Sequence, residues 1–96
     1  MAIPRLVGMV HLGALPGSPG FTGDLDEVIQ AAMTDAEAIA AAGFDGVMVE
    51  NFGDAPFFPD RVPPVTIAAM TRCVLAVREV CEGNDEKGAL PVGVNV

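Results

Sequence analysis

The chain alternates short apolar runs with longer segments in which apolar residues recur every three or four positions. The short runs, at about residues 5–10, 46–50 and 91–96, have the length and flanking Gly, Pro or polar residues of β-strands. The longer segments, at about 24–42 and 64–82, have the period of amphipathic α-helices. The predicted order is β-α-β-α-β, and equivalent strand positions recur at intervals of 40 to 45 residues, at Val7, Val47 and Val92.

The first predicted helix has sequence signals at both ends. Asp24 and Glu27 form a capping box with Asp in place of Ser or Thr, and acidic residues in the first turn suit the helix dipole. Gly43 is well placed to end the helix. The buried stripe is predicted to contain Leu25, Val28, Ile29, Ala32, Met33, Ala36 and Ile39.

The second predicted helix begins at Pro63-Pro64 and ends near Gly83. Its predicted buried face consists of Ile67, Met70, Val74, Val77 and Cys81. The two cysteines, Cys73 and Cys81, lie eight residues apart in this helix. Helical rise separates them by roughly 12 Å, which exceeds the ~7 Å that a disulfide can bridge. They are therefore expected to be free thiols that pack in the core, as in a reducing compartment.

Successive βα units build either a doubly wound sheet or a (β/α)8 barrel. A dinucleotide-binding sheet requires G-x-G-x-x-G directly after the first strand, but the segment here is the long loop HLGALPGSPGFTGD, and the sequence contains no P-loop motif. All three strands end in polar residues: His11, then Glu50-Asn51, then Asn95. Because barrel enzymes take their functional groups from the carboxyl ends of several strands, the predicted fold is the N-terminal β-α-β-α-β portion of a TIM barrel with parallel strands.

The alternation of side chains along each strand predicts which residues share a face. The valines of the second and third strands, Val47, Val49, Val92 and Val94, are expected to pack under helices. Their neighbours are expected to point into the barrel: Met48, Glu50, Gly93 and Asn95, with Met9 and His11 matching them unless Val10 faces inward instead. Neighbouring strands lie about 4.8 Å apart, so the strand-end residues would gather at one rim.

His11, Glu50 and Asn95 are the candidate catalytic residues, and each also has a structural interpretation. The histidine can cap the loop that follows it, and the asparagine can pin a loop. A carboxylate directly after the apolar run GVMV is costly to bury unless it is paired or faces a site, which favours function at Glu50. The trio suits proton transfer or carbonyl polarisation. Two plausible ligands make a weak metal signal, so no metal site is predicted. The sequence does not identify a cofactor.

The loop ENFGDAPFFPD supplies the candidate ligand-binding residues Asn51, Asp54 and Arg61. Arg61 can bind an anion or pair with an acid such as Asp54 or Asp60. Three phenylalanines cluster in the same loop: Phe52, Phe57 and Phe58. Loops usually run over surfaces, so these rings suggest a lid, an apolar substrate wall or a contact with a protein partner. Alternatively, they close the barrel mouth against a neighbouring loop.

Composition narrows the class of partner. Apolar residues make up 51% of the 96 and charged residues only 19%, which is typical of a chain that buries a core. Thirteen acidic against five basic residues give a net charge of −8, which argues against nucleic acid and against anionic membrane surfaces. No apolar stretch is long enough to span a bilayer, and residues 1–12 do not form a signal peptide. A cytoplasmic protein is expected, and its partner can be a small molecule or another protein.

Four motifs, GMVHLGALPGSPG, AGFDGVMVENFGDAPF, VPPVTIAAMTR and PVGVNV, together resemble the beginning of the BtpA family, also called BtpA/SgcQ. The resemblance runs from about Leu6 to the last residue. It implies a TIM-type barrel similar to the ribulose-phosphate-binding superfamily. It also implies a role that, in the cyanobacterial founding member, concerns the accumulation of photosystem I reaction-centre proteins. The family supplies no agreed catalytic residues to carry over.

A complete barrel takes about 250 residues, so this chain is expected to be an N-terminal fragment that ends inside its third strand. Three functional hypotheses follow. The first is an enzyme or small-molecule binder that works at the barrel mouth through Glu50 and His11. The second is an assembly factor that acts through the phenylalanine loop without catalysis. The third is a truncated chain with no independent function.

Overall fold

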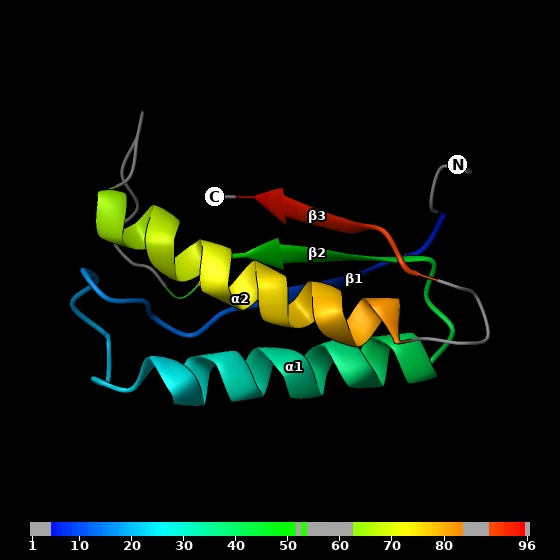
Figure 1. The fold of residues 1–96 in the computed structure, drawn as a ribbon, viewed down its shortest axis with the longest axis horizontal. Helices are drawn as coiled ribbons and strands as arrows, with labels where there is room; N and C mark the ends of the chain where they lie inside the picture. Colours follow the sequence, from blue (N-terminus) through cyan, green and yellow to red (C-terminus); the bar gives the residue numbers. More distant parts are fainter. Residues whose placement is uncertain (1–4, 52, 54–62, 84–88, 96) are drawn as a thin grey trace.

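The computed structural model describes residues 5–51, 53, 63–83 and 89–95. Its elements, in chain order, are β1 (Val7–His11), α1 (Leu25–Ala41), β2 (Gly46–Glu50), α2 (Pro64–Glu82) and β3 (Val92–Asn95). The three strands form one parallel sheet in the order β1-β2-β3. Their carboxyl ends point the same way, and both helices cover one face of the sheet (Figure 1). The predicted parallel α/β architecture is confirmed.

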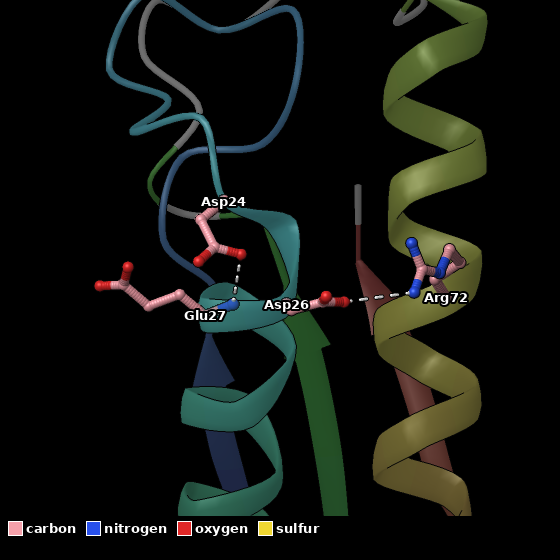
Figure 2. A network of polar contacts seen from close by, with 4 residues as sticks. All are labelled: Asp24, Asp26, Glu27 and Arg72. Carbon is pink, nitrogen blue, oxygen red and sulfur yellow. Dashed lines mark hydrogen bonds and ion pairs between the residues drawn. The ribbon is translucent and has the colours of Figure 1, made fainter.

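Local signals determine where α1 begins and ends. The Asp24 carboxylate accepts a hydrogen bond of 3.2 Å from the backbone N–H of Glu27, as an N-cap does (Figure 2). At the other end Gly43 has a φ of +86°, a left-handed conformation that glycine adopts without steric cost. Figure 2 also shows Asp26 of α1 facing Arg72 of α2. The Oδ1 of Asp26 and the guanidinium nitrogen of Arg72 are 3.5 Å apart. Both side chains are well exposed, so this pair contributes at most about 1 kcal/mol.

The core lies between the sheet and the two helices. Val10, Val47 and Val49 are at most 1% exposed and supply its sheet side. Most of its helix side consists of Val28, Ala32, Ala36, Ala69, Met70, Cys73, Val77 and Cys81. Close approach of α1 to β1 requires a residue without a side chain, because a Cβ built on Gly8 would lie 2.5 Å from Cγ2 of Ile39. Val47 and Val49 of β2 and Val10 of β1 therefore pack under the helices.

Two apolar positions differ from the sequence prediction. Ile67 was placed on the buried face of α2, but it is 57% exposed, because the buried stripe runs instead through Thr66, Ala69 and Cys73. Val94 was expected to lie under a helix, but it is 47% exposed. Its strand, β3, is at the edge of the sheet. Periodicity alone does not reveal which flank of a helix has a neighbour.

Both thiols are free and fully buried. Burial raises the pKa of Cys73, which the nearby Arg72 lowers in part, and burial raises the pKa of Cys81. We expect both to react slowly with a disulfide reagent in the native protein and rapidly once urea unfolds it. Between the ordinary thiol pKa of the unfolded chain and the raised pKa of the folded protein, the folded state keeps thiol protons that the unfolded chain has lost. The free energy of unfolding should therefore fall as pH rises through this range. Fast labelling of both thiols by the disulfide reagent without denaturant would contradict the predicted slow reaction.

Neither helix in the described part of the chain combines the length and apolar character needed to cross a membrane.

Candidate functional site

The carboxyl ends of the three strands bring three polar side chains into one row. In the parallel register His11 lies opposite Glu50, and Glu50 lies opposite Asn95. Strand β1 runs one residue further than predicted and includes His11, because the backbone N–H of Leu12 donates to the carbonyl of Glu50 at 2.9 Å. The residues that sequence analysis proposed as catalytic therefore stand side by side on adjacent strands.

The Glu50 carboxylate is the centre of this row. Its Oε2 lies 3.4 Å from Nε2 of His11, and its Oε1 accepts a hydrogen bond of 3.1 Å from Nδ2 of Asn95. The first distance is longer than the roughly 2.7–3.2 Å of a well-formed hydrogen bond, so we describe it as a close electrostatic contact. The His11 side chain is 48% exposed and that of Glu50 only 25%. Glu50 is thus partly sheltered between two neighbours, and His11 is the more accessible group.

The row lies on the face of the sheet that the helices leave uncovered. Along β1 the burial pattern alternates, with Val10 buried while Met9 and His11 are exposed. Two residues before each polar group, the same face carries the apolar row Met9, Met48 and Gly93. Met48 leans over Gly93, since a Cβ built there would lie 2.9 Å from the methionine Cε. The polar rim therefore sits directly above an apolar floor.

Backbone contacts beyond the strands hold the rim in place. The Gly53 N–H donates to the carbonyl of Leu12 at 3.1 Å, so the residues after β2 are joined to those after β1. Leu12 itself is 3% exposed. Sequence reasoning did not identify Leu12 or Gly53 as supports of the site. The sequence offered one signal for each: Leu12 is an apolar residue directly after His11, and Gly53 is a glycine that closely follows the polar end of the second strand.

The other predicted ligand-binding residues are placed differently or not described. Asn51 follows Glu50 and is 3% exposed. Within the described residues, Thr66 is the other buried polar side chain. The predicted ligand residues Asp54 and Arg61 lie outside the described residues, as do the aromatic residues Phe52, Phe57 and Phe58. Their proposed roles stay predictions.

The row can donate, accept and transfer protons. A carboxylate, an imidazole and an amide supply both hydrogen-bond donors and acceptors at one rim. Within the described part of the chain, no cluster of three or more His, Cys, Asp or Glu side chains could hold a metal ion.

A parallel β-α-β-α-β sheet with polar residues at the carboxyl ends of its strands matches successive units of a (β/α) barrel. The chain belongs to the BtpA family, whose model matches residues 3–96. That family implies a TIM-barrel fold, so the three strands are part of a barrel.

Relatives of the chain come from distant organisms. An uncharacterized protein of Thermococcus kodakarensis is 48% identical over 91 residues, which cover 95% of this chain and 32% of the relative. The photosystem I biogenesis protein BtpA of Synechocystis is 43% identical over 91 residues, which cover 95% of this chain and 29% of the relative. An uncharacterized mitochondrial protein of Caenorhabditis elegans is 33% identical over 67 residues, which cover 70% of this chain and 24% of the relative. The chain thus spans about a third of these relatives' length or less, and no solved structure matches it.

Proposed function

We propose that the protein binds a small molecule bearing hydroxyl and carbonyl groups at the rim of its strands and transfers a proton there. The observation that supports this is the Glu50 carboxylate, which lies between His11 and Asn95 on the uncovered face. Holding an ionisable group in a partly sheltered position is costly unless the group is paired or faces a site, and Glu50 has polar neighbours on both sides while lying at the uncovered face. An imidazole beside a carboxylate is a common arrangement for general acid-base catalysis.

The charge of the chain restricts the part of a ligand that this rim accepts. With a net charge of −8 and a carboxylate at its centre, the row repels a phosphate and suits uncharged hydroxyl or carbonyl groups. In barrels of this type a phosphate is often bound after the seventh and eighth strands, which are not among the three strands here. Ribulose 5-phosphate is a suitable probe, because its sugar portion carries the hydroxyl and carbonyl groups that the row would contact while its phosphate can lie away from the row.

The test compares Glu50→Gln with a matched carboxylate far from the rim. Glu82 ends α2 and pairs with Arg78 on the surface at 2.9 Å, so Glu82→Gln removes a carboxylate without touching the site. We expect Glu50→Gln in the intact protein to weaken ribulose 5-phosphate binding by about 10- to 100-fold, because a hydrogen bond to a charged group contributes about 1.5–3 kcal/mol. The dissociation constant is measured by calorimetry, with the melting temperature as the folding control.

Three results would contradict the proposal. The first is that the wild-type protein fails to bind the probe. The second is that Glu50→Gln binds the probe as tightly as the wild type does. The third is that Glu82→Gln weakens binding as much as Glu50→Gln does. The first result rejects this ligand class, and the other two reject the position of the site.

A second proposal is a role in assembling other proteins. It is supported by the name of the Synechocystis relative, a photosystem I biogenesis protein, and it assigns the contact to the loop containing Phe52, Phe57 and Phe58. An assembly role of this kind does not require the rim carboxylate. The Glu50→Gln variant therefore separates the two proposals, because it should impair proton transfer and leave association with reaction-centre proteins unchanged.

A further inference from the structure

We infer that Asn95 is a specificity-determining residue that selects a hydroxyl group of the ligand, which donates a hydrogen bond to the amide oxygen Oδ1. This inference rests on the proposed function and deepens it, since it names the ligand group that the β3 end of the row recognises. It depends on the hydrogen bond between Asn95 and Glu50 and on the atoms of the amide that this bond leaves over.

The hydrogen bond to Glu50 fixes the orientation of the Asn95 amide. Nδ2 of Asn95 lies 3.1 Å from Oε1 of Glu50, within the usual range for an N–H donor and an oxygen acceptor. An ionised carboxylate only accepts hydrogen bonds, so the opposite orientation would place the amide oxygen against a carboxylate oxygen. The amide nitrogen is therefore held at Glu50, and Oδ1 is the end of the amide that remains for another group.

Asn95 lies where a bound molecule can reach it. It is exposed, and it is the last residue of β3, the edge strand of the sheet. The register places it opposite Glu50, at the same rim of the sheet. Within the part of the chain that the structure describes, the bond to Glu50 is the one hydrogen bond of the Asn95 side chain. Its Oδ1 can therefore accept a hydrogen bond from a ligand.

The atoms that this hydrogen bond leaves over match a hydroxyl group. An asparagine amide has two N–H donors and an oxygen with two lone pairs, so after the bond to Glu50 one N–H and both lone pairs remain. A hydroxyl group can donate to Oδ1 and also accept from the remaining N–H. A carbonyl or ether oxygen can only accept, and an ammonium group can only donate. Of these groups, the hydroxyl alone uses both ends of the Asn95 amide.

The experiment measures the dissociation constants of ribulose 5-phosphate and of its three monodeoxy analogues, which each lack one hydroxyl group. In the intact protein, Asn95→Ala should weaken binding of ribulose 5-phosphate by about 2- to 12-fold, the range that one neutral hydrogen bond supplies. For one of the analogues the same substitution should have no effect, because the hydroxyl that Asn95 contacts is already missing. Gln30→Ala is the matched control, since it removes an exposed amide from α1 and should leave all four constants unchanged.

The orientation of the amide is measured separately, in the ¹⁵N,¹³C-labelled intact protein without a ligand. The side-chain N–H signals of Asn95 should shift with pH at the same midpoint as the carboxyl carbon of Glu50, because the two groups are hydrogen-bonded. The side-chain N–H signals of Gln30 should not shift at that midpoint. In Glu50→Ala the signals of Asn95 should lose this pH dependence.

Equal weakening of all four compounds by Asn95→Ala would overturn the inference, and so would Asn95 signals that do not follow the ionisation of Glu50. If Asn95→Ala does not fold, Asn95→Ser takes its place, because it also removes the amide. If the wild type binds none of the four compounds, the proposed ligand class and the selected hydroxyl group are both rejected. If it binds ribulose 5-phosphate and Asn95→Ala leaves that affinity unchanged, the proposed function stands and only the role of Asn95 is rejected.

Discussion

Replacing Leu15 with Ala is expected to lower the free energy of unfolding by about 2–5 kcal/mol, the usual cost of a cavity left by a fully buried leucine. Leu15 is 0% exposed and belongs to the main core although it lies in the loop after β1. Its carbonyl also accepts a hydrogen bond of 3.0 Å from the backbone N–H of Ser18. The side chain therefore ties the loop that follows His11 to the body of the molecule.

Leu75→Ala is the matched control for this prediction. Leu75 is 56% exposed on α2, so truncating it removes the same atoms without opening a cavity. Its effect on unfolding should be within about 0.5 kcal/mol, and alanine is a good helix former. Urea unfolding of the intact protein, followed by circular dichroism, measures both variants. Equal losses in the two variants would show that Leu15 is not part of the core.

The regular elements could be predicted because each one is specified locally. The spacing of Val28, Ala32 and Ala36 matches the helical period, and all three are buried as the spacing requires. Asp24 and Gly43 mark the limits of α1 through one side-chain hydrogen bond and one left-handed residue. Ile67 is the exception. It has the right residue type for a core position, but burial depends on which flank of α2 faces the sheet, which no local pattern encodes.

The meeting of His11, Glu50 and Asn95 could be predicted because it depends only on strand direction and side-chain alternation. Parallel strands place their carboxyl ends together, and the register pairs these three residues directly. The pairing of individual atoms could not be predicted, since it depends on side-chain rotamers. The link between Leu12 and Gly53 could not be predicted either, because it depends on the conformation of two loops.

The exposed apolar side chains fit a chain that is part of a barrel. Val7 and Met9 are 40% and 44% exposed on the face of β1 that the helices leave uncovered. Val94 is exposed on the edge strand β3. In a closed barrel that face is the packed interior, and edge strands have neighbours. The chain spans about a third of its relatives' length, so these positions are the ones that further strands and helices would contact.

Replacing Gly53 with Ala is the substitution expected to affect stability and the site together. A Cβ at this position would lie 2.7 Å from the Leu12 carbonyl oxygen, 2.7 Å from the Ala14 nitrogen and 2.8 Å from the Gly13 carbonyl carbon. All three are backbone atoms, so no side chain can rotate away to relieve the clash. We expect a loss of about 1–3 kcal/mol in unfolding free energy, the usual cost of overpacking, because the two loops must separate.

The same clash should move His11, since the displaced backbone begins at the residue directly after it. The imidazole proton signals of Gly53→Ala should therefore differ from those of the wild type. Gly83→Ala is the control, because a Cβ there meets its nearest atom only at 3.6 Å and the residue has an ordinary φ of −80°. That variant should be as stable as the wild type or slightly more stable, since alanine restricts the unfolded chain. If Gly53→Ala melts like Gly83→Ala and leaves the His11 signals in place, the contact between the two loops does not support the rim.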